Sequence, residues 1–241
     1  LLHRARARWS KNPAITKVRH DIASLLERSG GVLPGTEIAE ALLAQRGTTA
    51  TGPARLVEAR AVVRAALETE AVRANDRFAW RRLGGGAAMV VALRTDELEA
   101  EELADYASNL GVAADQLANA EPLPTPDAVA ARLTAVPLPA GLAPLPVFRL
   151  ARLAAAASAT AAVSSRLEIY RRGMEPERAV RLARAALLGT GTLTEQEVRD
   201  RVAARFPMAE ALPPRPQLDR LLQQTLGMVW TEEGVGPTGV R

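Results

Sequence analysis

The residues of this sequence whose types and positions could do chemistry are basic, and the chemistry that they predict is contact with nucleic acid. Guanidinium and ammonium groups bind DNA phosphates, and arginine also reads base edges. The candidate DNA-binding residues lie in a basic N-terminal segment, on two predicted helices and on one predicted hairpin: Arg4, Arg6, Arg8, Lys11, Arg55, Arg60, Arg81, Arg82, Arg215 and Arg220. The N-terminal segment, which also holds His3, Lys17 and Arg19, has no acidic residue before Asp21, so it could lie along phosphates or in a minor groove.

A second interpretation of the same arginines stays open, because acidic residues lie among them. Glu58, Glu68 and Glu70 occur in the same predicted helix as three of the arginines. At about 100° per residue, Arg55 and Arg64 fall on opposite sides of that helix. Such a helix presents no coherent basic face, so it suits a solvated surface, or a protein-docking or dimerisation surface, as well as it suits DNA.

Enzyme chemistry has few side chains to draw on. The sequence of 241 residues has no cysteine and only two histidines, His3 and His20, which excludes disulfide frameworks, zinc fingers and thiol nucleophiles. Gly84–Gly86 is not followed by the lysine and hydroxyl residue of a P-loop, and residues 189–191 lack the third glycine of a dinucleotide motif. A hairpin turn accounts for the first of these glycine runs.

Carboxylate pairs are the remaining candidates for acid and base work. Glu101 with Asp105, and Glu232 with Glu233, are expected on a polar face and in the C-terminal tail, where solvated charge is the simpler explanation. We therefore predict no catalytic residue, no metal and no cofactor in this chain.

Charge divides the chain into three parts. Residues 1–95 carry a net charge of +8, residues 96–146 a net charge of −8 and residues 147–241 a net charge of +4. Two basic blocks around an acidic one favour separate units with a polar joint. The acidic block also holds the proline-rich stretches 121–126 and 137–146, which indicate extended linker segments and leave a PxxP ligand as an alternative.

Apolar periodicity predicts the elements that position the basic residues. Helices are expected over residues 13–28, around residues 38–45 and from Pro53 to Leu67, with a short extended piece at residues 32–33. The period then changes to two, with strands at residues 78–82 and 87–93 around a turn at residues 83–86. Three helices followed by a hairpin describe a winged helix-turn-helix.

The same pattern recurs in the C-terminal part of the sequence. Residues 31–45 align without a gap on residues 191–205, and Thr194 with Glu197 forms a capping box that fixes the start of the equivalent helix. A preceding helix is expected over residues 176–188 and a following one over residues 216–226. Residues 228–230 open a second wing, but the glycine-rich residues after Glu233 are not expected to supply a return strand.

Three further helices are expected between the two repeats. One spans residues 96–110, with Leu98, Leu103, Tyr106 and Leu110 facing inward, and an alanine-rich one spans residues 145–165. A short one is capped by Thr125 and places Val129, Leu133 and Val136 on one face.

The predicted fold is therefore mainly α, with two winged helix-turn-helix units joined by a helical and proline-rich connector and with short wing hairpins. The predicted domains are residues 1–95, with the basic leader and the first winged helix; residues 96–165, the connector; and residues 166–241, the second winged helix with an incomplete wing. The longest apolar stretch is too short to cross a membrane, since about 20 residues are needed. We expect a cytoplasmic fragment of a longer protein that does not bind a membrane.

Several stretches of the sequence resemble a known family. They are residues 6–9, 12–19, 77–82, 102–107, 163–170, 205–207 and 212–222. They are similar to the C-terminal region of the large serine/threonine protein kinases of the phage growth limitation (Pgl, or BREX type 2) defence systems of actinobacteria, the PglW type. None of these stretches is a catalytic signature, so the resemblance implies that the kinase domain lies outside this chain.

The resemblance also implies a role for the chain. It would be a non-catalytic region that binds double-stranded DNA and so targets or regulates the kinase. The alternative is a docking or dimerisation module within the defence complex that binds no DNA. The expected partners are thus duplex DNA, other phage-defence proteins or a second copy of the chain.

Overall fold

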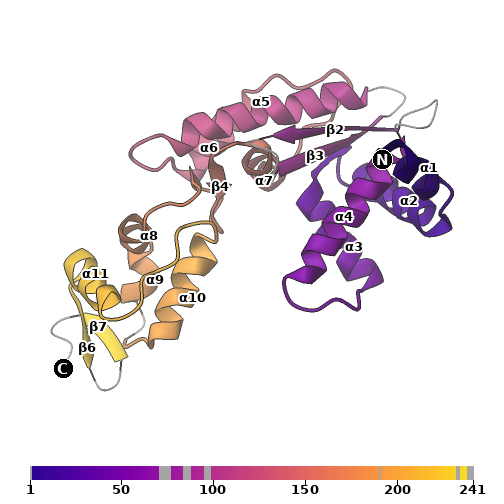
Figure 1. Ribbon diagram of the computed structural model, residues 1–241. Coiled ribbons are helices and arrows are strands. Elements are labelled where there is room, and N and C mark those ends of the chain that lie inside the picture. Colours follow the sequence, from indigo (N-terminus) through magenta and orange to yellow (C-terminus); the bar gives the residue numbers. More distant parts are fainter. Residues whose placement is uncertain are drawn as a thin grey trace. The chain divides into compact units, whose positions relative to one another are not determined.

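Most of the described chain is helical, with short antiparallel strands between the helices, which confirms the prediction of a mainly α protein (Figure 1). The structure, a computed structural model, describes residues 2–70, 77–83, 88–94, 99–189, 191–231 and 234–237. The chain forms two units: unit 1 is Leu1–Gln116 with Ala130–Ala159, and unit 2 is Leu117–Val129 with Thr160–Arg241. The three domains predicted from charge remain a prediction.

Unit 1 begins with a helix over the basic leader that the sequence analysis did not predict, and continues with three helices near their predicted positions, of which α2 has the predicted limits. Its first elements are α1 (Leu2–Ser10), α2 (Pro13–Arg28), β1 (Val32–Pro34), α3 (Gly35–Arg46) and α4 (Ala54–Glu68). The Asn12 side chain caps α2 by accepting a hydrogen bond from the Ala14 backbone N–H at 2.9 Å, and Pro13 occupies the first helical position. Gly30 and Gly31, both at φ +86°, follow the end of the helix.

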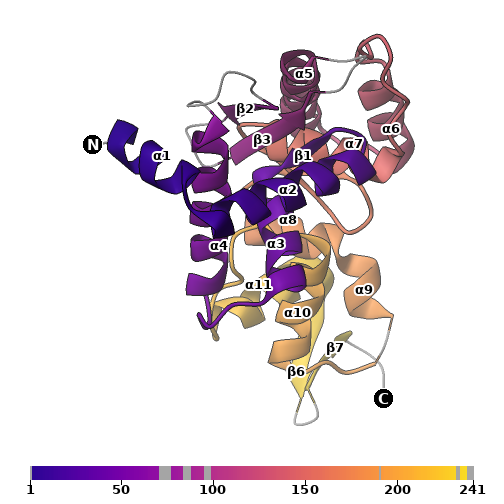
Figure 2. The same ribbon diagram turned by 90° about the vertical axis from the view of Figure 1, so that its right-hand side faces the viewer.

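A three-stranded antiparallel sheet completes this part of unit 1. The strands β2 (Phe78–Leu83) and β3 (Ala88–Leu93) pair with each other, and β1 pairs with the other edge of β3, so the order is β1-β3-β2 (Figure 2). In the central row of the sheet, Leu33 lies opposite Val91, and Val91 lies opposite Trp80. The predicted apolar faces meet in one core, which includes Val18, Ile22, Leu26, Ile38, Leu42, Val63, Leu67, Phe78 and Val91.

The middle of the chain supplies two longer helices to unit 1. Helix α5 (Ala100–Ala118) begins later and ends later than predicted, and it buries Leu103, Tyr106 and Leu110 as expected. Helix α7 (Val147–Ala157) packs on β1 and β3. The predicted turn at residues 84–86, the inward side chain of Leu98 and the pair Glu232 and Glu233 lie outside the described residues.

The alanine-rich helix is shorter than the sequence predicted. It was expected to run to Ser165, but α7 ends at Ala157. The Ser158 hydroxyl donates a hydrogen bond to Asp115 Oδ1 at 2.6 Å, and the Ala159 backbone N–H donates to Asp115 Oδ2 at 3.3 Å. The prediction was wrong because helix propensity is a local preference, which a carboxylate from another helix overrides by holding the backbone in a non-helical turn.

The short helix between the proline-rich stretches is α6 (Pro126–Thr134). The Ala128 backbone N–H donates to Thr125 Oγ1 at 3.3 Å, and Val129, Leu133 and Val136 are buried. The predicted cap and apolar face of this helix are therefore confirmed.

Unit 2 opens with a two-stranded sheet and continues with helices and a hairpin. The elements are β4 (Ala161–Val163), β5 (Ile169–Arg171), α8 (Pro176–Leu182), α9 (Arg184–Leu188), α10 (Glu195–Arg205), α11 (Gln217–Leu226), β6 (Met228–Thr231) and β7 (Gly234–Pro237). The expected helix over residues 176–188 is thus divided at Ala183. The capping box is present, since Thr194 Oγ1 accepts from the Glu197 backbone N–H and the Glu197 side chain accepts from the Thr194 backbone N–H.

The return strand that the sequence was expected to lack is present as β7. It pairs antiparallel with β6, and Val235 is fully buried in the core of unit 2. The backbone of β7 passes so close to Leu193 that a side chain on Gly234 would collide with it. Glycine is therefore the residue that allows this strand to form, although glycine usually weakens strands.

The sheet arrangement of unit 1 recurs in unit 2. Leu193 forms an isolated bridge with Val235, and Val235 lies opposite Trp230 on β6. This row matches the row of Leu33, Val91 and Trp80 in unit 1. Element order and strand pairing are therefore the same around the two segments of the sequence that align with each other.

Candidate functional site

The basic leader is a helix with two different sides. Arg6 on α1 turns toward α4, where its Nε donates to Glu68 Oε2 at 2.9 Å. Arg4, Arg8 and Lys11 are exposed, and none of them has an acidic partner within the described residues. At about 100° per residue, Arg4 and Arg8 share the face of α1 opposite Arg6, and Lys11 follows in the turn after the helix. The leader is therefore attached to unit 1 through Arg6 and displays a basic stripe on the other side.

A buried ion pair joins α2 to the segment that follows α4. The Arg19 Nε donates to Glu70 Oε1 at 2.6 Å, and both side chains are only 3% exposed. Arg77, just before β2, lies 3.7 Å from the same carboxylate. The sequence placed Arg19 among residues that could follow DNA phosphates, but its burial excludes that contact. The position of Arg19 around the helix could have indicated its burial, since Arg19 lies next to Val18 on the buried face of α2.

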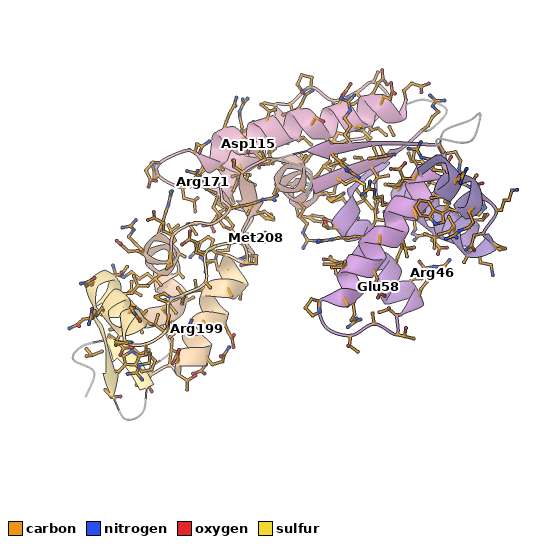
Figure 3. The ribbon with its side chains drawn as sticks, viewed as in Figure 1. Arg46, Glu58, Asp115, Arg171, Arg199 and Met208 are labelled. Atoms are coloured by element: carbon orange, nitrogen blue, oxygen red, sulfur yellow. The ribbon has the colours of Figure 1, made fainter. Side chains whose placement is uncertain are left out.

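Helix α4 occupies the position of the third helix of the first repeat, and its exposed surface mixes apolar side chains with one glutamate and with three arginines, Arg55, Arg60 and Arg64. Val57 is 64% exposed and Val62 is 39% exposed, although both are apolar. Glu58 and Ala61 are exposed beside them (Figure 3 labels Glu58). About 140° of helix rotation separates the two valines, whereas Val57 and Ala61 are only about 40° apart and share one face. A large exposed apolar side chain on such a face is typical of interaction surfaces.

The predicted DNA-binding arginines of α4 do not form one patch. Arg55 and Arg60 are both exposed, but about 140° of helix rotation separates them. They therefore flank the apolar face from two sides.

The hairpin of β2 and β3 directs its two arginines to neighbouring groups. Arg81 Nη2 lies 2.6 Å from Asp105 Oδ1 on α5, and both side chains are about half exposed. The guanidinium of Arg82 lies 5.8 Å from the centre of the Trp80 ring. Both arginines reach the surface, and Asp105 neutralises part of the charge there.

The remaining candidates lie at the third helix of the second repeat, α11, with Arg215 in the turn before it and Arg220 on it. Arg215 Nε donates to Asp219 Oδ1 at 2.8 Å, and its guanidinium stacks 4.3 Å from the centre of the Trp230 ring. The hydrogen bond to Asp219 raises the pKa of Arg215. Arg220 is exposed at a groove of about 510 Å³, whose wall includes the carboxylates of Glu175, Glu177 and Glu210. Three carboxylates beside one guanidinium do not favour a phosphate backbone.

The perturbed carboxylates of the protein serve the fold. Burial raises the pKa of Glu37, and the charges of Arg152 and Arg149 offset this only in part. For Glu168, burial acts to raise the pKa, but hydrogen bonds from Arg205 and Ser164 and nearby arginine charges outweigh it and lower the pKa. The negative charge of Glu40, three residues further along α3, also raises the pKa of Glu37, to a smaller extent.

Few groups in the described part of the chain could support catalysis. Across the described ranges there is no cluster of three or more histidine, cysteine, aspartate or glutamate side chains that could hold a metal ion. Glu101 and Asp105 are exposed on α5, and His20 is exposed on α2. A cavity of about 670 Å³ between the end of α2 and residues 141–149 is lined mainly by apolar groups. None of the described helices is long and apolar enough to cross a membrane.

Comparison with known proteins identifies one related sequence. No protein-family model matches the chain. The chain is 37% identical, over 230 residues, to the probable kinase PglW of Streptomyces coelicolor. The similarity covers 86% of this chain and 15% of that protein, so the chain spans only a small part of its relative. The chain is therefore related to a segment of the PglW-type kinases, as the sequence stretches indicated.

Proposed function

We propose that this chain is a non-catalytic region of a PglW-type defence kinase, built from two winged helix-turn-helix units, and that it docks the kinase on protein. The similarity to about one seventh of the length of a probable kinase supports a role outside the catalytic domain. A docking region of this kind raises the local concentration of the kinase at its target without taking part in the chemistry.

Element order supports the winged helix proposal for both repeats. In unit 1 the order is α2, β1, α3, α4 and the hairpin of β2 and β3, with β1 paired to the second hairpin strand. In unit 2 the order is α8 with α9, the bridge at Leu193, α10, α11 and the hairpin of β6 and β7, with the same pairing. In such a fold α4 and α11 stand where a DNA-binding relative would place its recognition helix.

The surface of α4 is the observation that favours docking on protein over DNA. A helix that enters the major groove offers donors and cations to bases and phosphates. The outward face of α4 centres on Val57 and Ala61, with the carboxylate of Glu58 on one flank and the guanidinium of Arg64 on the other. Burying these apolar groups against a protein would be favourable, whereas Glu58 would repel phosphates.

The test uses the full-length kinase in its phage-defence system. Val57→Glu should reduce protection against phage at least about tenfold if docking through this face is required, because a buried unpaired charge is costly. Val112→Glu on α5 is the matched control, since Val112 is 58% exposed and lies on another helix of unit 1. Equal protection by the two variants would contradict docking through α4.

DNA binding is the second candidate, and the stripe on α1 favours it. Arg4 and Arg8 are spaced i and i+4 on α1 and are exposed on one side of it, and Lys11 is exposed in the turn that follows. Three phosphate contacts would give a log-log salt slope of about −2.7 for binding to random duplex DNA. In this candidate the arginines of α4 and the wing would support the leader.

The salt titration decides this candidate. Arg4→Gln with Arg8→Gln should weaken binding and reduce the slope by about 1.8, because two phosphate contacts are lost. Arg184→Gln is the control, since Arg184 is exposed on α9 in unit 2. A slope that stays flat, or no binding below about 10 µM, would reject DNA binding.

A further inference from the structure

The outward face of α4 has a charge arrangement that complements itself. We infer that the docking partner of this face is a second copy of the chain, bound through a two-fold contact between α4 of each copy and centred on Ala61. This inference rests on the proposed docking function and names its partner.

Small and apolar side chains form the middle of the proposed contact. Ala61 is exposed at the centre of the outward face, with Val57 at 64% and Val62 at 39% exposure on either side of it. An alanine at the crossing point lets two helices approach to the 8–10 Å typical of packed helices. Val57 lies about 40° of helix rotation from Ala61, whereas Val62 lies about 100° away, so the contact would remove mainly Val57 from water, which is the favourable term in association.

The charges of the same face are arranged for a two-fold contact. Glu58 lies three residues before Ala61 and Arg64 lies three residues after it. At about 100° per residue these side chains fall on opposite flanks of Ala61, about 60° to either side. We place the two-fold axis in the plane of the contact, over Ala61 and perpendicular to the line from Glu58 to Arg64. This axis brings Glu58 of each copy to Arg64 of the other copy.

Both charged groups are available for such pairing. Arg64 is 53% exposed, and its Nε lies 3.8 Å from Glu68, at the limit of ion-pair distance. The carboxylate of Glu68 already accepts hydrogen bonds from Arg6, so it does not depend on Arg64 for a partner. Glu58 is exposed, and no salt bridge within the described residues involves it.

The charge arrangement allows a swap experiment with the complete chain. Sedimentation equilibrium over about 1 µM to about 1 mM measures the dimer dissociation constant. Glu58→Arg and Arg64→Glu should each weaken the dimer at least about tenfold, because each places two like-charged pairs in the contact. An equimolar mixture of the two variants should recover dimers, since every pair across the contact then has opposite charges.

The controls keep the outcome independent of folding. Glu101→Arg changes charge by the same amount at an exposed position of α5 and should leave the dissociation constant unchanged. The double variant Glu58→Arg with Arg64→Glu should dimerise like the original chain. A chain that stays monomeric throughout the series, or variants that do not recover when mixed, would overturn the inference.

The inference and the proposed function fail in different ways. If Val57→Glu abolishes phage protection while the chain is monomeric, the face docks on another protein, and the inference that its partner is a second copy of the chain is wrong. If the charge-swap variants behave as expected but the kinase with Val57→Glu still protects fully against phage, the dimer exists. Docking through the α4 face is then not the function of the chain.

Discussion

Leu193 and Val235 exchange both of their backbone hydrogen bonds, with a nitrogen to oxygen distance of 2.8 Å in each direction. The contact joins the segment before α10 to the return strand of the hairpin. It depends on Gly234, whose φ of +136° is unfavourable for other residues and whose added Cβ would lie 2.6 Å from the Leu193 carbonyl oxygen. The end of the second hairpin is therefore held by a close contact between backbones.

Replacing Gly234 by alanine should destabilise unit 2. The collision with Leu193 and the strained φ together should cost about 1–3 kcal/mol. Thermal unfolding and hydrogen exchange of the Val235 amide would measure this. Gly236→Ala is the matched control, because a Cβ there would lie 3.5 Å from Thr192 Cγ2, an ordinary contact. Equal stability of the two variants would contradict the prediction.

Gly111 should also resist substitution, although it lies within a helix. Alanine in place of glycine normally stabilises a helix interior by about 1 kcal/mol. At this position an added Cβ would lie 2.6 Å from the backbone carbon and oxygen of Ala157, at the end of α7. We expect Gly111→Ala to lower the melting temperature, while Asn109→Ala on the exposed face of α5 leaves it unchanged or higher. A more stable Gly111→Ala variant would show that α7 can move away.

The buried pair of Arg19 and Glu70 should respond in a non-additive way. Among the described residues, Arg19→Met leaves Glu70 buried with the more distant Arg77, and should cost about 3–5 kcal/mol in the free energy of unfolding. Removing the second charge as well, in Arg19→Met with Glu70→Gln, should restore part of that loss. Chemical denaturation of the two single variants and the double variant measures the coupling. A double variant that is as unstable as the sum of the single ones would argue against a direct pair.

Unit 2 should lose stability in acid partly through Glu168. Its carboxylate accepts a hydrogen bond from Arg205 Nη2 at 2.7 Å, and its pKa in the folded protein lies below the ordinary 4.5. Because the folded-state pKa is lowered, the stabilisation is present above pH 4.5 and is lost as the pH falls through the folded value.

A pH series of melting temperatures checks this expectation. Glu168→Gln should be less stable than the original chain at pH 7, by about 1–3 kcal/mol, because a charged hydrogen bond is lost. The difference should disappear in strong acid. Glu177→Gln is the control, since Glu177 is 64% exposed and forms only a surface pair with Arg181. A difference that does not vary with pH would contradict this explanation.

Much of the fold follows from local sequence signals. Asn12 and Pro13 at one end and Gly30 and Gly31 at the other set the limits of α2, and Thr194 with Glu197 sets the start of α10. Such caps act within a few residues of the chain. The candidate surface on α4 was only partly predictable, because the sequence showed that its arginines are scattered but not which side chains are exposed.

Contacts between distant segments decided the rest. The sequence by itself determined the helices of both repeats and the alignment of one repeat on the other, since periodicity and caps are local. Three features were decided only by the tertiary structure. Asp115 binds Ser158 at the end of α7, and Glu70 pairs with Arg19 in the interior. Leu193 binds the backbone of Val235, which lies in the strand β7. Each of these outcomes depends on a partner from a distant part of the chain, and no local preference records that partner.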